Sequence, residues 1–147
     1  MRIYLDMCCY NRPYDDQAQL KVAMETQSKL HIQMLVREKK LELIVSYMLR
    51  YECSKNPFEM RRNAIFDFIQ ENAAGYVGDD RKKVIEAKAT EIMKTGIKFK
   101  DACHVASAIY AGCEYFISTD ARLLKYNTQE IKMVTPIEFI METEGDE

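Results

Sequence analysis

Short apolar runs alternate with longer amphipathic segments along the chain, and this alternation predicts the secondary structure. Four runs are rich in β-branched or aromatic residues, which is typical of strands. The predicted strands are residues 2–6, 41–45, 114–118 and 131–134. Between them, apolar residues recur three or four positions apart, as on one face of a helix. The predicted helices are residues 16–37, 46–53, 58–69, 80–93, 101–112 and 121–126, and a last one begins at Pro136.

Two segments are less regular. The helix over 16–37 carries an apolar stripe, and the sequence leaves open whether this stripe belongs to the core or to an interface. The stripe consists of Leu20, Ala23 or Met24, Leu30 or His31, and Met34 or Leu35. After residue 69, Gly75 and Gly78 indicate a loop, because glycine commonly marks turns.

Strands that alternate with helices predict an α/β fold. We expect three layers, α/β/α, around a central and mainly parallel sheet of four or five strands. A chain of 147 residues is long enough for one buried core, so we expect a single domain over residues 1–141. The acidic residues 142–147 are predicted to form a frayed tail.

Composition narrows the class of protein. The chain is 48% hydrophobic and 30% charged with a net charge of −2, which is typical of a globular domain and excludes a protein that is basic all over. No apolar run approaches the roughly 20 residues of a membrane span, and no secretory signal is recognisable, so we expect a cytoplasmic protein with no membrane partner. The five cysteines have no regular spacing and are expected to be reduced packing residues.

Four acidic residues follow or flank the predicted strands. Asp6 ends the first strand, Glu52 lies on the helix after the second, Asp101 opens a helix, and Asp120 follows the third strand. Each one alone is explained by turn formation, helix capping or solvation. Ligands of α/β sheets, however, bind where strands end, so all four can meet at one edge. Four carboxylates repel one another unless a cation neutralises them, and oxygen ligands suit Mg²⁺ or Mn²⁺.

A resemblance to a known family extends over nearly the whole chain. It is carried, in order, by IYLDMCCYNRPYDD (3–16), YMLRYE (47–52) and KDACHVASAIYAGCEYFISTD (100–120). These segments resemble the PIN-domain nucleases, in particular the VapC-like toxins of prokaryotic toxin–antitoxin pairs. By position, the four acids match the acidic site of that family, and Ser118 matches its hydroxyl position. Many members have Thr or Ser directly after the first Asp, whereas this chain has Met7, Cys8 and Cys9.

The resemblance implies metal-dependent hydrolysis of RNA. Asp6, Asp101 and Asp120 would hold one or two Mg²⁺ or Mn²⁺ ions, and Glu52 would bind a metal or orient the attacking water. Supporting polar contacts to water or phosphate are expected from Ser118, Thr119 and Asn11. Arg12 is a candidate for contact with the RNA backbone, although a solvated surface arginine is the favoured explanation. An antitoxin partner and a homodimer are implied by the resemblance alone.

Several alternatives have less support. Adjacent Cys103 and His104 diverge on a helix, which disfavours a zinc site, and a cysteine hydrolase would need His104 beside Cys8 or Cys9. A glycine-rich turn for a nucleotide is missing after the first strand, and Cys8 stands where haloacid-dehalogenase-like phosphatases have a second Asp. The serious alternative is a PIN-fold module that binds RNA or a protein with little or no nuclease activity.

Overall fold

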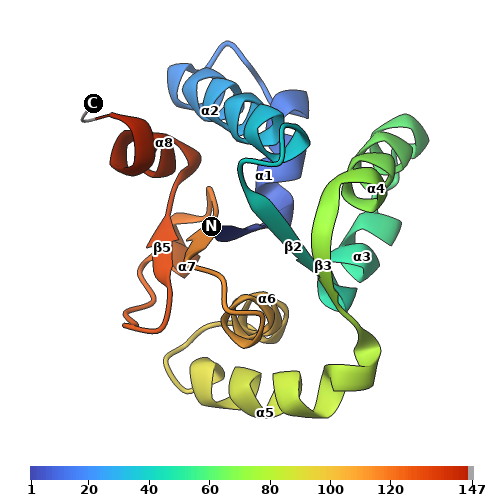
Figure 1. Cartoon of the computed structure of the whole chain (residues 1–147), viewed down its shortest axis with the longest axis vertical. Helices are drawn as coiled ribbons and strands as arrows, with labels where there is room; N and C mark the ends of the chain where they lie inside the picture. The colour runs from blue at the N-terminus through green and yellow to red at the C-terminus, as the bar shows by residue number, and fades with distance from the viewer. Residues whose placement is uncertain (146–147) are drawn as a thin grey trace.

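The apolar runs form one parallel sheet in the computed structural model, which describes residues 1–145 (Figure 1). Its strands are β1 (Arg2–Leu5), β2 (Glu42–Ser46), β3 (Ala73–Val77), β4 (Tyr115–Ile117) and β5 (Lys132–Val134). They lie in the order β3-β2-β1-β4-β5, and every neighbouring pair is parallel. The prediction of an α/β fold with a mainly parallel sheet is therefore confirmed.

Helices cover both faces of the sheet. They are α1 (Met7–Asn11), α2 (Leu20–Arg37), α3 (Tyr47–Ser54), α4 (Glu59–Asn72), α5 (Lys82–Met93), α6 (Phe99–Tyr110), α7 (Ala121–Leu124) and α8 (Pro136–Glu144), with 3₁₀ turns at Arg12–Tyr14 and Asp79–Arg81. Figure 1 shows α2, α4 and α8 on one side of the sheet and α5 and α6 on the other. Because both faces are covered, the central strand is apolar throughout: Ile3, Tyr4 and Leu5 have no exposed surface.

The chain changes direction across the sheet at β1. From β1 it proceeds to β2 and β3 on one side, and it then returns to place β4 and β5 on the other. The ends of β1 and β4 therefore meet at a topological switch point, which is where open α/β sheets bind their ligands. None of the helices in the described part of the chain is long and apolar enough to span a membrane.

The segment that contains Gly75 is a strand rather than the predicted loop. It forms β3, which pairs with β2 at the edge of the sheet. A Cβ added to Gly75 would lie 2.8 Å from Cδ1 of Ile44, so a larger residue would clash with the neighbouring strand. Glycine is present here because of a close approach, and the sequence pattern cannot distinguish this use from a turn.

Other boundaries also differ from the predictions. Met7–Asn11 forms a helical turn that was not predicted, α2 begins at Leu20, and α6 begins two residues before Asp101. The predicted frayed tail is wrong for residues 142–144, because α8 continues to Glu144. There Tyr115 donates a hydrogen bond to Glu142 (3.0 Å), and His31 pairs with Glu144 (2.7 Å). Residues 146–147 lie outside the described part of the chain.

The apolar stripe of α2 faces solvent. Leu20, Met24, Leu30 and Met34 are all exposed, Leu20 to 74%. The inward face of α2 instead buries a mixture of aliphatic and polar residues: Val22, Glu25, Thr26, Lys29, Ile32 and Val36. A helix that exposes its most apolar stripe is unusual for a chain without a partner.

Candidate active site

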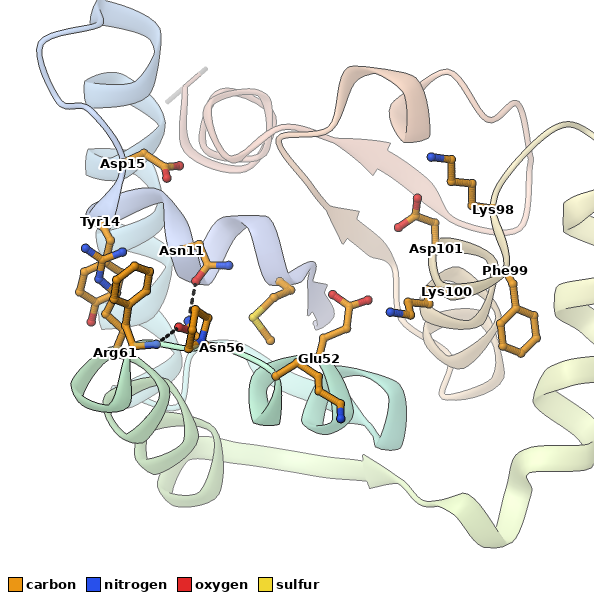
Figure 2. Close-up of a pocket in the computed structure, with 14 residues that line it drawn as sticks. Asn11, Tyr14, Asp15, Glu52, Asn56, Arg61, Lys98, Phe99, Lys100 and Asp101 are labelled. Atoms are coloured by element: carbon orange, nitrogen blue, oxygen red, sulfur yellow. Dashed lines mark hydrogen bonds between the residues drawn. The ribbon is translucent and has the colours of Figure 1, made fainter.

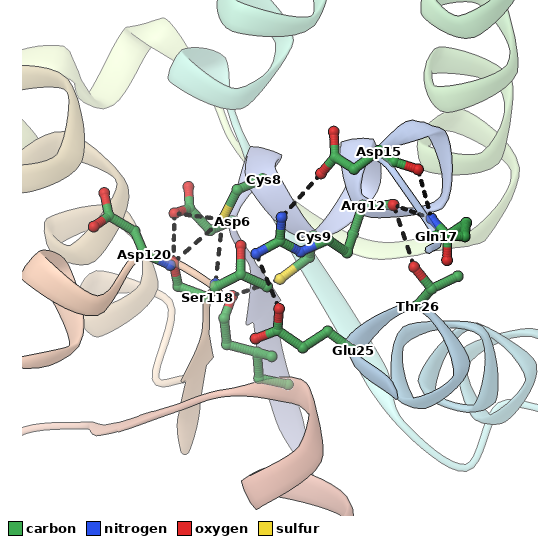
Figure 3. Close-up of polar contacts among 12 residues, drawn as sticks. Asp6, Cys8, Cys9, Arg12, Asp15, Gln17, Glu25, Thr26, Ser118 and Asp120 are labelled. Atoms are coloured by element: carbon green, nitrogen blue, oxygen red, sulfur yellow. Dashed lines mark hydrogen bonds and ion pairs between the residues drawn. The ribbon is translucent and has the colours of Figure 1, made fainter. Parts of the chain in front are cut away.

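Asp6 lies at the switch point and is held by both strands that meet there. It follows β1, is buried, and caps α1 by accepting a hydrogen bond from the Met7 N–H (2.9 Å). Its Oδ2 accepts a hydrogen bond from the Ser118 hydroxyl (2.8 Å), and Ser118 Oγ accepts one from the Asp120 N–H (3.0 Å) (Figure 3). Asp120 in turn caps α7 through Oδ1. The two loops that follow β1 and β4 are thus fixed to each other.

Cys8 contributes to this contact. Its thiol lies 3.4 Å from Oδ2 of Asp6 and 3.3 Å from the Ser118 hydroxyl, and it accepts a hydrogen bond from the Thr119 N–H (3.3 Å). The other four cysteines are buried, as predicted, but Cys8 is partly exposed and adjoins the acids. Cys8 thus gives Asp6 and Ser118 a polar neighbour, although no hydroxyl residue directly follows Asp6.

Glu52 is oriented by a buried chain of hydrogen bonds. Its Oε1 lies 2.8 Å from Nε2 of His104, whose Nδ1 lies 2.6 Å from the Tyr4 hydroxyl. Tyr4 contacts Ser46 Oγ at 2.7 Å, and Ser46 caps α3 by accepting from the Leu49 N–H. Hydroxyl groups both donate and accept, so the chain can run in either direction as His104 changes charge.

The pair of Glu52 and His104 shifts both pKa values toward the charged forms. Burial raises the pKa of Glu52, but the hydrogen bond and positive charge of His104 outweigh it, and the pKa is lowered. Burial lowers the pKa of His104, but its bond to Glu52 and the nearby carboxylates of Asp6 and Asp101 outweigh this, and the pKa is raised. Both ring nitrogens of His104 are engaged, so neither is available to a cysteine thiol as a hydrolase would require.

The pKa of Asp101 is raised by its burial and by the other acids at this edge. Burial raises its pKa, and the carboxylates of Asp6, Asp120 and Glu52 raise it further, while His104 opposes them. The fold therefore brings the four acids into one electrostatic neighbourhood, although they come from β1, α3, α6 and the turn after β4. Asp101 lies in the first turn of α6 but does not cap it, since the N-cap is Lys98.

The free oxygens of these acids are suited to a hard cation. Within the described residues, both oxygens of Asp101 and one oxygen each of Glu52 and Asp120 have no hydrogen-bond partner. Carboxylate oxygens are the donors that Mg²⁺ and Mn²⁺ prefer, and a cation would relieve the repulsion that raises the pKa of Asp101. The acidic side chains do not converge on one metal position. Residues 1–145 contain no group of three or more His, Cys, Asp or Glu close enough to hold a metal ion.

The remaining predicted site residues are in different situations. Thr119 donates its N–H to Cys8, and Asn11 lies 3.5 Å from the amide nitrogen of Asn56. Arg12 is engaged by two carboxylates: it lies 3.0 Å from Asp15 and 2.9 Å from the fully buried Glu25 (Figure 3). Its guanidinium therefore belongs to an internal ion-pair cluster and is not directed at a ligand.

A groove of about 770 Å³ opens beside the acids (Figure 2). Glu52 and Asp101 line it together with residues that sequence reasoning did not select: Tyr14, Lys55, Phe58, Arg61, Lys98, Phe99 and Lys100. Arg61, Lys98 and Lys100 belong to two basic clusters that are visible in the sequence, at 61–62 and 94–100. The aromatic residues of the lining gave no signal in the sequence, because only the fold shows that their rings are exposed in the groove.

Solved structures share this arrangement of elements. FitAB bound to an IR36 DNA fragment aligns with a TM-score of 0.59 at 15% identity, over 91% of this chain and 94% of that chain. The chain has a PIN-domain fold. VapBC2 from Rickettsia felis, bound to a promoter DNA fragment, aligns with a TM-score of 0.56 at 13% identity, over 90% and 97% of the two chains. FitAcB from Neisseria gonorrhoeae aligns at 0.54 and 14%, over 92% and 98%.

The PIN-domain resemblance noted in the sequence is thus confirmed for the fold over most of the chain. No protein-family model and no curated protein sequence matches the chain. The individual roles of the four acids at this PIN-domain edge stay predictions.

Proposed function

We propose that the chain is a divalent-metal-dependent endoribonuclease and the toxin of a toxin–antitoxin pair. The observation that supports the proposal most is geometric: Ser118 joins Asp6 to the turn of Asp120 at the switch point, and Glu52 and Asp101 line the groove beside it. Burial, and then the charges of the other acids, raise the pKa of Asp101. Asp6, Glu52, Asp101 and Asp120 would hold one or two Mg²⁺ or Mn²⁺ ions. Such a cation, when bound, activates water and balances the charge that develops on a phosphodiester.

The chain's own residues have distinct parts in this proposal. Ser118 fixes the orientation of Asp6 by donating to its Oδ2, and His104 fixes that of Glu52. Mutation of a residue that orients a metal ligand in this way commonly lowers metal affinity or activity by roughly 10- to 100-fold. Thr119 and Asn11 would contact water or a phosphate oxygen. Arg12 is left out of RNA binding because Asp15 and Glu25 engage it.

Cleavage of labelled RNA by purified protein tests the site. With Mg²⁺ or Mn²⁺ the parent should cut RNA, and EDTA should abolish the cut. Asp6→Asn and Asp101→Asn should each slow cleavage by about 100-fold or more, because each removes a carboxylate from the cluster. Asp67→Asn, which changes an exposed carboxylate on α4, is the matched control and should cleave like the parent. Equal rates for parent and both site variants would show that the site is wrong.

Metal binding can be measured without activity. Mn²⁺ should raise the melting temperature of the parent by mass action, and Asp101→Asn should lose most of that shift. A parent that is stabilised by Mn²⁺ and binds RNA but never cuts it would favour the alternative, a PIN-fold binding module.

An antitoxin partner belongs to the same proposal. The VapBC2 and FitAB structures that share the fold are toxin–antitoxin complexes. By the family resemblance, such a partner would lay a segment over the acidic edge and so block the groove. A small protein encoded beside this chain should co-purify with it and suppress RNA cleavage at equimolar ratio. Cleavage that continues in its presence would contradict the pairing.

The exposed stripe of α2 supports the proposal of a homodimer. Leu20, Met24 and Met34 are exposed apolar side chains along one helix, and exposed apolar surface of this kind commonly marks an interface. Light scattering should give twice the mass of the 17.2 kDa chain. Met24→Glu with Met34→Glu should yield a monomer, whereas Val84→Glu, which changes an exposed aliphatic residue on α5, should not.

A further inference from the structure

The groove beside the acids has aromatic rings at one end that are only partly buried. Tyr14 is 41% exposed and Phe58 is 55% exposed, although both line the groove. Figure 2 shows Tyr14 and Arg61 together at one end of the groove, while Lys98, Phe99 and Asp101 lie at the other. Exposed rings that are gathered in a concave polar surface offer flat apolar faces to a ligand.

Arg61 joins these rings into one cluster. Its Cζ lies 4.2 Å from the ring centre of Phe58 and 5.0 Å from that of Tyr14, both within the range of cation–π attraction. No carboxylate in the described part of the chain lies within 4 Å of the Arg61 guanidinium. Its faces are therefore used by the rings, while its N–H groups remain available to an anion. We call Tyr14, Phe58 and Arg61 the stacking cluster.

Further cations line the groove. Lys55, Lys98 and Lys100 line the groove, and the amino groups of Lys55 and Lys100 lie 5.2 and 5.4 Å from the ring of Tyr51. None of the three forms an ion pair with a carboxylate of residues 1–145. The groove thus carries four cations that are complementary to a chain of phosphates, beside the carboxylates of Asp15, Glu52 and Asp101.

We propose that this groove binds single-stranded RNA, with a nucleobase stacked on the stacking cluster and backbone phosphates on Lys98 and Lys100. Bases within a duplex have their faces covered by their neighbours, whereas an unpaired base can leave its stack and lie on an aromatic ring. Glu52 and Asp101 line the same groove, so the stacking cluster would hold the strand while these two acids meet its backbone. The proposal rests on the proposed ribonuclease function and names the form of RNA that the site accepts.

Binding is tested in EDTA in an Asp6→Asn background, with Asp101→Asn as a second background should the first fold poorly. The probe is a fluorescein-labelled single-stranded RNA of 12 nucleotides, and anisotropy gives the Kd. Phe58→Leu removes the ring but keeps an apolar side chain, and Arg61→Lys keeps the charge but removes the planar group. Each should weaken binding by about tenfold, because base stacking on an aromatic ring has effects of that order.

A second stack on the same molecule supplies the matched control. Arg50 lies 5.2 Å from the ring of the exposed Tyr76 and 5.1 Å from Phe66, outside the groove. Tyr76→Leu and Arg50→Lys should therefore change the Kd by less than about twofold. Lys98→Gln and Lys100→Gln should weaken binding and each reduce the slope of log K against log salt by about one.

Four outcomes would overturn the proposal: no RNA binding, binding unaffected by Phe58→Leu and Arg61→Lys, equal weakening by the Arg50 and Tyr76 controls, or a duplex of the same sequence bound as tightly as the single strand. Capture of an antitoxin segment by the stacking cluster, without any effect of the variants on RNA, would have the same consequence. Failure of the proposed function is distinguishable. RNA binding that depends on the stacking cluster, without cleavage that depends on the acids, would contradict the ribonuclease proposal and support the groove proposal. Cleavage that depends on the acids, without RNA binding that depends on the stacking cluster, would contradict only the groove proposal.

Discussion

Two buried polar networks differ in how completely they are paired. One runs from Glu52 through His104 and Tyr4 to Ser46, and each of its contacts measures 2.6 to 2.8 Å. The other joins Arg12 to Glu25, which has no exposed surface. Within the described residues, both carboxylate oxygens of Glu25 and the Nε of Arg12 lack a hydrogen bond, so the contact is an ion pair without hydrogen-bond alignment.

The difference indicates that the two networks serve different ends. The first leads outward to Glu52, which is partly exposed and lines the groove, so its hydrogen bonds fix the direction of a side chain at the site. The second ends in a carboxylate that has no contact with solvent and whose one cation within 4 Å, among the described residues, is the guanidinium of Arg12. A buried charge of this kind costs free energy and depends on its single counter-ion. The first network should therefore matter chiefly to function, and the second chiefly to stability.

The largest expected effect is on the second network. Arg12→Met leaves Glu25 buried without a cation and should lower the free energy of unfolding by about 3 to 5 kcal/mol. Urea unfolding measures this change. Asp15→Asn, which removes the exposed partner of the same arginine, should cost less than about 1 kcal/mol. Equal costs for the two variants would mean that Glu25 is solvated in the folded protein.

Breaking the first network should affect both stability and cleavage. His104→Leu removes the partner of Glu52 and should cost roughly 2 to 3 kcal/mol and slow RNA cleavage by about 10- to 100-fold. His104→Gln keeps an N–H near the position of Nε2 and should restore much of the activity. Ser107→Ala on the same helix removes a buried hydroxyl that has no partner among the described residues, and it should be nearly neutral. Activity in His104→Leu equal to that of His104→Gln would exclude a positioning role.

Lys29 is a third buried charged group and lies on the same helix as Glu25. No carboxylate of residues 1–145 pairs with it. Burial lowers its pKa to about 8 from 10.5. The unfolded chain therefore binds more protons between these pH values, and stability should rise as pH rises from about 8 to about 10.5. Lys29→Met should remove this rise and be as stable as the parent, or up to about 2 kcal/mol more stable, at pH 7. A variant that keeps the rise would assign it to another group.

The smallest effect is the pH dependence of the first network. The raised pKa of His104 gives stability that is complete below about pH 6.5 and is lost as pH rises through the folded value. The lowered pKa of Glu52 gives stability that is lost as pH falls through its folded value. Urea midpoints measured across pH should show both declines in the parent, and Glu52→Gln should flatten both. Persistence of both declines in Glu52→Gln would place the titration elsewhere.

Sequence reasoning reached features that depend on local order along the chain. The apolar runs located β1, β2, β4 and β5, and the strand-end rule placed Asp6 and Asp120 at one edge, where the structure has them. It could not reach features that depend on distant partners. The bond between His104 and Glu52 joins residues 52 positions apart, and the glycine of β3 is explained only by Ile44 on the next strand.

The stripe of α2 shows a different limit. Its 3.6-residue period was visible, but periodicity gives the spacing of a face and not the direction in which the face points. Glu25 and Lys29 point inward because Arg12 and the rings of Tyr10 and Phe68 receive them. Those residues lie on α1, the following turn and α4, so no local pattern indicated that the apolar face of α2 would be the outer one.

The switch point has a consequence for the order in which the protein is made. Asp6 is synthesised 112 residues before Ser118, which holds it. A ribosome adds residues from the N-terminus at roughly 5 to 20 per second, so β1 waits several seconds for β4. Until then the central strand has an open edge and the acids have no common location. A chain that has not yet reached β4 would therefore lack the proposed RNA-cleaving edge, which would form only after Ser118 and Asp120 have been added.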